Sequence, residues 1–134
     1  MRSEHTEQKA LFQWAKLQEN KYPELKLMFA IPNVSYGGTR ADMLRGKKLK
    51  AEGRKRGIPD ICLPIPRGGN CTDEGQVDWY HGLFIEMKFG KNKLSKEQQW
   101  WVDNLEQQEY RAVVCYSFEE AKKIILDYLV IKSV

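Results

Sequence analysis

The sequence has no apolar run near the roughly 18 to 20 residues that a membrane-spanning helix needs, and its N-terminus has no apolar signal region. Cysteine is scarce: Cys62, Cys71 and Cys115 are odd in number and form no CxxC pair, which argues against a disulfide framework and a zinc site. The two histidines, His5 and His81, are too few and too far apart to suggest a histidine metal site. We therefore expect a protein of a reducing compartment, the cytoplasm, with no membrane partner.

The chain does have enough apolar sequence for a core, and a local excess of positive charge. Its 134 residues, of which 42% are hydrophobic, suit one domain over residues 1–134. Residues 40–56 contain eight basic residues and only two acidic ones, Asp42 and Glu52, although the whole chain has a net charge of only +4. Such a block suits nucleic acid, but a solvated helix face has the same composition. Its basic residues are Arg40, Arg45, Lys47, Lys48, Lys50, Arg54, Lys55 and Arg56.

Periodicity and capping residues predict helices interleaved with short strands. Helices are predicted from Ser3 to about residue 20, over 40–52, and after the capping boxes that begin at Ser95 and Ser117. Alternating or continuous apolar residues predict strands over 25–31, 60–65, 83–88 and 111–116, with a polar connection over 67–82. The order α-β-α-β-β-α-β-α predicts an α/β fold with a small mixed β-sheet flanked by helices.

Two carboxylates and a lysine fall in or beside the predicted strands. Asp60 ends the segment Gly57-Ile58-Pro59-Asp60 and precedes the apolar run Ile61-Cys62-Leu63. Glu86 and Lys88 are two apart, so their side chains lie on the same face of a strand. That strand is apolar at its other positions, which is typical of a central, covered strand. A central strand rarely carries two charges without a purpose.

Hydrolysis of a phosphodiester is a purpose that fits these residue types. The reaction needs an activated water, in-line positioning and stabilisation of negative charge, and a hard cation held by oxygen ligands serves all three. Asp60 and Glu86 supply two carboxylates, and Lys88 would lie beside the phosphate and orient the water or stabilise charge. The simpler alternatives are a turn aspartate after Pro59 and an exposed salt bridge between Glu86 and Lys88.

The motifs together resemble the VRR-NUC branch of the PD-(D/E)xK, or restriction-endonuclease-like, nuclease superfamily. The resemblance spans nearly the whole chain and includes a glutamate followed four residues later by glutamine in the first helix, a strand ending in Pro-Asn, Gly-x-Pro-Asp, Glu-x-Lys and a helix opening with Ser-x-x-Gln. The matching residues here are Glu4 with Gln8, Ile31-Pro32-Asn33, Gly57 to Asp60, Glu86 to Lys88, and Ser95 with Gln98.

The resemblance implies a site that holds Mg²⁺ or Mn²⁺ between Asp60, Glu86 and the main-chain carbonyl of Met87. It also implies catalytic roles for Glu4 and Gln98 beside Asp60, Glu86 and Lys88, with Gln8 in support. Two assignments stay open, because Glu7 is an alternative acid in the first helix and Gln98 could serve only as the capping partner of Ser95.

For function, the resemblance implies a metal-dependent endonuclease that cuts branched DNA, such as four-way (Holliday) junctions, and leaves a 5′-phosphate and a 3′-hydroxyl. Stand-alone members of the family look like viral or prophage proteins, which would act in the host cytoplasm, and two symmetric cuts suit a homodimer. Nicking, flap or restriction-like cleavage, or DNA binding without catalysis, are the alternatives.

The DNA contacts are expected from Asn33 and from the basic block of residues 40–56, although Asn33 could equally shape the Pro-Asn turn. Trp14 and Trp101 fall on apolar helix stripes, which predicts core positions for both. Trp100 lies one position off the inward face of its helix, and we expect it to pack in the core or against another subunit rather than to stack near DNA.

Overall fold

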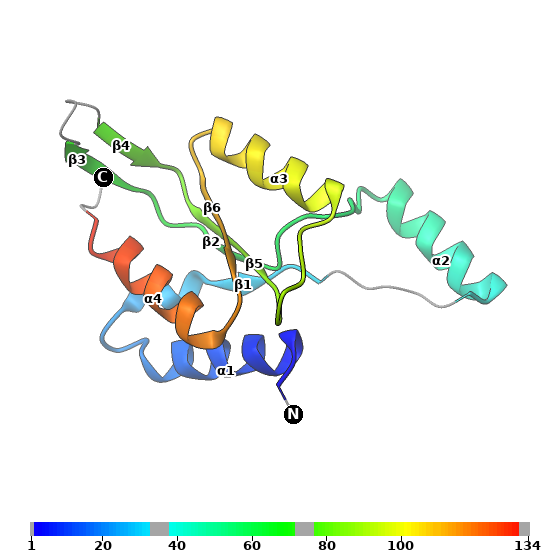
Figure 1. Cartoon of the computed structure of the whole chain (residues 1–134), viewed down its shortest axis with the longest axis horizontal. Helices are drawn as coiled ribbons and strands as arrows, with labels where there is room; N and C mark the ends of the chain where they lie inside the picture. The colour runs from blue at the N-terminus through cyan, green and yellow to red at the C-terminus, as the bar shows by residue number, and fades with distance from the viewer. Residues whose placement is uncertain (1, 33–37, 72–76, 132–134) are drawn as a thin grey trace.

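A computed structural model of the chain describes residues 2–32, 38–71 and 77–131 (Figure 1). Its helices are α1 (Glu4–Leu17), the 3₁₀ helix η1 (Pro23–Leu27), α2 (Arg40–Ala51), α3 (Lys96–Gln107) and α4 (Phe118–Leu129). Its strands are β1 (Phe29–Ala30), β2 (Ile61–Leu63), β3 (Arg67–Cys71), β4 (Val77–Tyr80), β5 (Leu83–Met87) and β6 (Arg111–Cys115). Over the described residues, no helix is both long enough and apolar enough to span a bilayer.

Strand β5 lies inside a small mixed sheet whose order is β1-β2-β5-β6. It pairs antiparallel with β2, where Ile61 lies opposite Ile85, and parallel with β6, where Glu86 lies opposite Val114. The strand predicted over 83–88 is therefore central, as its apolar composition indicated. Because it has a neighbour on both sides, its backbone is fixed along the whole length that carries the candidate carboxylate.

Helices cover both faces of this sheet. Helices α1 and α4 lie together below it and α3 lies above it in the view of Figure 1. Alternate residues of β5, Leu83, Ile85 and Met87, are buried in the core together with Leu11 of α1 and Ile125 of α4. Since side chains alternate along a strand, Phe84 and Glu86 point to the opposite face, the one that α3 covers. The small mixed sheet flanked by helices is as predicted.

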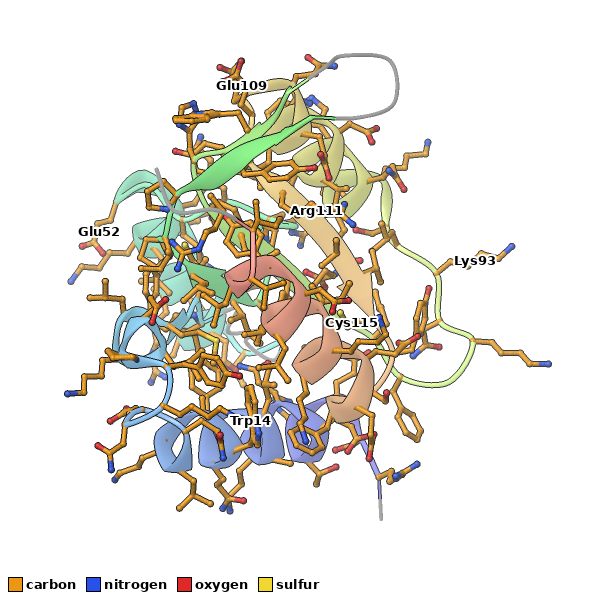
Figure 2. The ribbon with its side chains drawn as sticks, turned by 90° about the vertical axis from the view of Figure 1, so that its left-hand side faces the viewer. Trp14, Glu52, Lys93, Glu109, Arg111 and Cys115 are labelled. Atoms are coloured by element: carbon orange, nitrogen blue, oxygen red, sulfur yellow. The ribbon has the colours of Figure 1, made fainter. Side chains whose placement is uncertain are left out.

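Aromatic side chains of α1 and α4 pack together against the core. Trp14 of α1 meets Phe118 edge to face, with ring centroids 6.4 Å apart (Figure 2). Ser3 caps α1, since its Oγ accepts a hydrogen bond from the Thr6 N–H at 3.2 Å and Thr6 Oγ1 accepts one from the Ser3 N–H. These contacts fix where α1 begins, and hence where its first acidic residue lies.

The strand predicted over 25–31 is largely wrong. Only Phe29–Ala30 pairs with β2, and residues 23–27 form η1 instead. Pro23 stands at the start of that turn, where its fixed φ favours a tight helical turn. The buried residues are Leu25 and Met28, three apart, which is the repeat of a 3₁₀ helix rather than of a strand.

The polar connection predicted over 67–82 is also wrong, because β3 and β4 form a two-stranded antiparallel hairpin there. A buried charge anchors its base. Arg67 pairs with Glu24 at 2.6 Å and its Nε donates to the Leu129 carbonyl at 3.3 Å. Tyr128 donates its hydroxyl to the Ile65 carbonyl at 2.6 Å close by. These bonds tie the hairpin to η1 and to the end of α4.

Helix α2 stands away from the rest of the molecule (Figure 1), and it has no buried residue. Its predicted span of 40–52 agrees with the structure to within one residue. Thr39 caps it by accepting from the Asp42 N–H at 3.1 Å. Two apolar side chains, Met43 and Leu44, are exposed on it, so packing does not account for its position.

Candidate active site

Strand pairing brings Asp60 and Glu86 together. The antiparallel register that sets Ile61 opposite Ile85 puts the preceding residue, Asp60, beside Glu86. The Asp60 Oδ2 accepts a hydrogen bond from the Met87 N–H at 2.7 Å, and its main-chain carbonyl accepts one from the Ile31 N–H at 2.7 Å. Asp60 is therefore held between β1 and β5 rather than being only a residue of a turn.

The Glu86 carboxylate is buried, with only 3% of the residue exposed. Its Oε1 accepts a hydrogen bond from Gln98 Nε2 at 2.8 Å. Its Oε2 is buried and has no hydrogen-bond partner among the described residues. The alternative of an exposed Glu86–Lys88 salt bridge does not fit this burial. A buried carboxylate oxygen without a partner is costly, and a ligand is one explanation of it.

The Gln98 side chain both completes a helix cap and contacts Glu86. Its Oε1 accepts from the Ser95 N–H at 2.9 Å and its backbone N–H donates to Ser95 Oγ at 3.1 Å, which completes a capping box at the start of α3. Its Nε2 is left to donate to Glu86. The cap thus fixes the amide of Gln98 with its donor directed at the carboxylate.

Gly57 sets the distance between the segment before β2 and the start of α3. It has φ +83°, and a Cβ placed on it would lie 2.5 Å from the Glu97 carbonyl carbon and 2.7 Å from the Gln98 N. Both the positive φ and this close approach require glycine. The glycine of the Gly-x-Pro-Asp segment therefore has a physical role, which is to let α3 bring Gln98 up to Glu86.

Without a cation, Glu86 keeps a proton near neutral pH and shares a hydrogen bond with Asp60, because two like charges at this place would repel each other. Burial, the nearby Asp60 and Glu4 raise the pKa of Glu86 to about 8, against the lowering effect of Lys88. Burial and the Glu4 charge also raise the pKa of Asp60, although the hydrogen bond from Met87 and the charge of Lys88 oppose the shift. A cation placed between the carboxylates would reverse these shifts.

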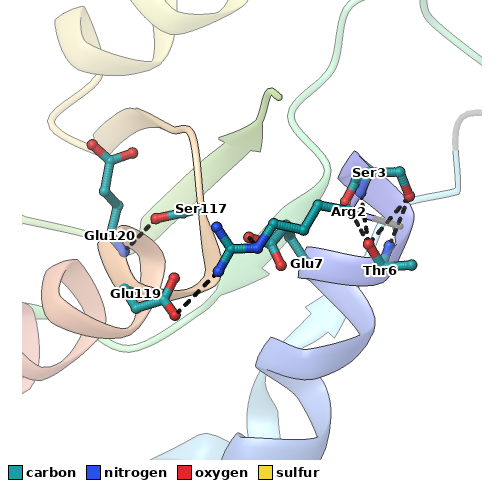
Figure 3. Close-up of polar contacts among 7 residues, drawn as sticks. All are labelled: Arg2, Ser3, Thr6, Glu7, Ser117, Glu119 and Glu120. Atoms are coloured by element: carbon teal, nitrogen blue, oxygen red, sulfur yellow. Dashed lines mark hydrogen bonds and ion pairs between the residues drawn. The ribbon is translucent and has the colours of Figure 1, made fainter. Parts of the chain in front are cut away.

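Glu4 and Glu7 lie in different surroundings on α1. The Glu4 charge acts on both Asp60 and Glu86, which places its carboxylate near the pair. Glu7 is buried and faces Arg2, whose Nε lies 4.0 Å from Glu7 Oε1 while the same guanidinium lies 3.9 Å from Glu119 (Figure 3). Gln8 is half-buried beside them. The charge of Glu4 therefore acts on the carboxylate pair, whereas Glu7 faces Arg2.

Lys88 lies close enough to the pair for its charge to lower the pKa of Glu86, whereas the other predicted residues lie farther out. Lys88 follows β5 and is half-buried, and the loop after it carries Lys91 and Lys93, the latter directed away from the body (Figure 2). The basic residues of α2 are exposed and stand apart from the carboxylates, whereas Arg54, Lys55 and Arg56 lead directly into Gly57. Asn33 lies outside the described residues.

The donor set fits a hard divalent cation. Over the described residues, no three His, Cys, Asp or Glu side chains come together as a metal cluster, so Asp60 and Glu86 would need a main-chain or water oxygen as well. One oxygen of each carboxylate is held by a protein N–H, and the second oxygen of Glu86 is unused. The carbonyl of Met87, whose N–H binds Asp60, is adjacent to that pair.

Comparison with known proteins identifies a family and a similar structure. The VRR-NUC domain model matches residues 3–119. A solved structure described as a VRR_NUC domain protein is 25% identical, with a TM-score of 0.76 over 98% of this chain and 92% of its own. A search of curated proteins found no match.

We predict that Glu86→Gln stabilises the protein at pH 8 in EDTA. An unfolded chain binds the Glu86 proton with the ordinary pKa of 4.5, whereas the folded chain binds it with a pKa of about 8. Between these values the folded state holds more protons, so the free energy of unfolding falls as the pH rises. Urea denaturation should show a gain on the order of 2 kcal/mol at pH 8 and little gain at pH 4.

The exposed Glu52→Gln protein is the control and should match the parent at each pH. Mg²⁺ or Mn²⁺ at pH 8 should stabilise the parent more than the Glu86→Gln protein, because only the parent keeps both carboxylates. A Glu86→Gln protein that is no more stable than the parent at pH 8 would contradict the repulsion between Asp60 and Glu86.

We also predict that Gly57→Ala displaces the start of α3. The new Cβ would overlap backbone atoms of Glu97, which cannot move aside as a flexible side chain could. The free energy of unfolding should fall by more than about 2 kcal/mol, the backbone cost of a positive φ plus the overlap. Gly90→Ala is the matched control, since Gly90 has φ +65° with open space around it, and it should lose about 1 kcal/mol. Equal losses from both substitutions would mean that the close approach has no effect.

Proposed function

Since the chain belongs to the VRR-NUC domain family, we propose that it is a metal-dependent endonuclease that hydrolyses phosphodiester bonds in branched DNA, such as four-way junctions. The observation that carries the proposal is the pairing of the half-buried Asp60 with the buried Glu86, one of whose carboxylate oxygens has no partner among the described residues. Burying two repelling carboxylates costs stability, which a binding-only module has no reason to retain.

In the proposed site, Asp60, Glu86 and the main-chain carbonyl of Met87 hold Mg²⁺ or Mn²⁺. When bound, such an ion supplies Lewis-acid chemistry, because it lowers the pKa of water and offsets negative charge on the phosphate. Gln98 keeps the Glu86 carboxylate in one orientation through its capped amide. Glu4 adds negative charge near the pair and would orient the attacking water.

Lys88 would contact a non-bridging phosphate oxygen, because it directly follows β5 and its two-residue spacing from Glu86 directs both side chains to the same side of extended backbone. Its positive charge would stabilise the extra charge that builds up as water attacks phosphorus. The bond between phosphorus and the 3′ oxygen then breaks, and the leaving oxygen takes a proton. The products are a 5′-phosphate and a 3′-hydroxyl.

The basic residues of α2 extend the proposed DNA surface beyond the reacting phosphate. They are exposed on a helix that no other element buries, and residues 54–56 continue the charge toward Gly57 and α3. Asn33 of the Pro-Asn motif would add a further DNA contact. A strand held by this surface would run from α2 to the carboxylates.

We further propose a homodimer, since paired cuts across a junction need two sites at a fixed separation. Val130, at the end of α4, is 78% exposed and offers apolar surface to a second copy. Light scattering should give about twice 15.7 kDa. A monomer that leaves singly nicked junctions would favour a nicking or flap-cutting activity instead.

We predict that Asp60→Ala, Glu86→Ala and Lys88→Ala each lower cleavage at least about 100-fold while DNA binding survives. Cleavage of labelled duplex, flap, fork and four-way junction DNA with Mg²⁺ or Mn²⁺ measures the first effect, and gel shifts in EDTA measure the second. The same panel identifies the preferred DNA structure. Full activity in EDTA would refute metal dependence.

Glu4→Gln and Glu7→Gln form a matched pair within α1. Glu4→Gln should lower cleavage tenfold or more, because its charge acts on Asp60 and Glu86. Glu7→Gln should keep most of the activity, since Glu7 faces Arg2. The opposite result would reassign the helix acid to Glu7.

We predict that replacing Lys47, Lys48 and Lys50 together by Ala weakens DNA binding and flattens its salt dependence. For every lysine that binds a phosphate, its removal should reduce the log–log salt slope by about one unit. The control removes the same charge elsewhere, at the exposed Lys9, Lys16 and Lys26. If both triple variants keep the parent's slope, α2 does not contact DNA.

A further inference from the structure

On α3, the helix that carries Gln98, lies a hollow of about 260 Å³, lined by Arg56, Lys96, Glu97, Trp100 and Trp101. We propose that this hollow receives an unpaired nucleotide of the DNA substrate, with its base stacked on Trp100. The proposal rests on the nuclease function above and adds to it a feature of the substrate, a base outside the duplex near the cut.

Trp100 is exposed to an unusual degree for so large an apolar side chain. Its exposed fraction is 58%, so the expectation that it packs in the core of this chain is wrong. Its ring meets that of Trp101 edge to face, with centroids 5.4 Å apart and planes at 84°. Trp101 therefore packs against Trp100, while much of the Trp100 ring remains exposed, as in the aromatic platforms on which bases stack.

The support beneath Trp100 is rigid. Trp101 Nε1 donates to the Arg56 carbonyl at 2.9 Å, which fixes the second indole against the segment before Gly57. Trp101 also lines an adjoining hollow of about 470 Å³ together with Ile31, Pro32, Arg54 and Lys55. Because Trp101 is held in place, Trp100 packs against a fixed neighbour, and little side-chain entropy would be lost when a base binds Trp100.

The charges around the hollow suit one nucleotide. Arg56 and Lys96 are exposed, and neither forms an ion pair with another residue in the described part of the chain, so both remain available to phosphate oxygens. The carboxylate of Glu97 would repel a phosphate but accepts well from the amino edge of a base. The two cationic side chains suit the phosphate of a nucleotide and the acceptor suits its base, with the sugar between them.

The position of the hollow links it to the reaction. Trp101 lies three residues after Gln98, so roughly 4.5 Å along α3 separates the aromatic pair from the residue that holds Glu86. Arg56 immediately precedes Gly57, the point where the chain touches α3. The hollow and the carboxylate pair are therefore connected through the same helix and the same segment before Gly57. Perfect duplex offers no unpaired base, whereas flaps and forks do.

The test uses the full chain in EDTA, so that DNA is bound but not cut. Gapped and forked DNA carries 2-aminopurine at the unpaired position next to the branch, and stacking on indole quenches its fluorescence. Trp100→Ala should abolish the quenching and weaken binding of this DNA about tenfold, with duplex binding unchanged. Trp100→Phe should keep most of both signals, because it retains a ring.

Trp79→Ala is the matched control, since Trp79 is an exposed tryptophan on β4, in the hairpin. It should leave quenching and affinity unchanged. The proposal is overturned if Trp100→Ala keeps the quenching, if it weakens duplex and forked DNA equally, or if light scattering shows that it changes the assembly, which would place Trp100 between copies of the chain. Cleavage by Glu86→Ala protein would refute the nuclease site without affecting the quenching result.

Discussion

The repulsion between the buried Glu86 and the half-buried Asp60 is the constraint on which the rest of the site depends. Asp60 and Glu86 lie on neighbouring strands, and burial with mutual repulsion raises the pKa of Glu86 to about 8. Two hydrogen bonds offset part of this loss of stability: the Met87 N–H donates to Asp60, and the Gln98 side chain donates to Glu86. Those donors are in turn set by the central position of β5 and by the cap of α3. Stability and chemistry therefore oppose each other at this point of the molecule.

Much of this arrangement could be predicted from the sequence because local rules determine it. The two-residue spacing of Glu86 and Lys88 on an apolar strand indicated a central strand, and capping residues located α3 and α4 closely. The family resemblance identified further candidate site residues that the spacing alone did not, above all Gln98. The Ser95–Gln98 pair looked like a choice between a cap and a catalytic residue, but an amide has a donor and an acceptor and can serve both.

What could not be predicted depends on contacts between distant parts of the chain. The alternation at residues 25–31 suggested a strand. Pro23 instead begins a 3₁₀ turn, and only Phe29–Ala30 pairs with β2. The hairpin of β3 and β4 was hidden by Gly and polar residues, and it depends on Arg67 reaching Glu24, 43 positions away. The Trp101 bond to the Arg56 carbonyl, 45 positions away, left no local signal either.

Helix α2 has a consequence for how this protein meets its partner. It is 12 residues long, contains Gly46, and no residue in it is buried, so it gains little from tertiary packing. Isolated helices of that length are marginal in water, and an interior glycine weakens them by about 1 kcal/mol. Clustered lysines and arginines along it repel one another until a polyanion lies beside them. Bound along α2 as proposed above, DNA would offset this repulsion and stabilise the helix, so that part of the binding energy would be used in ordering the surface that binds.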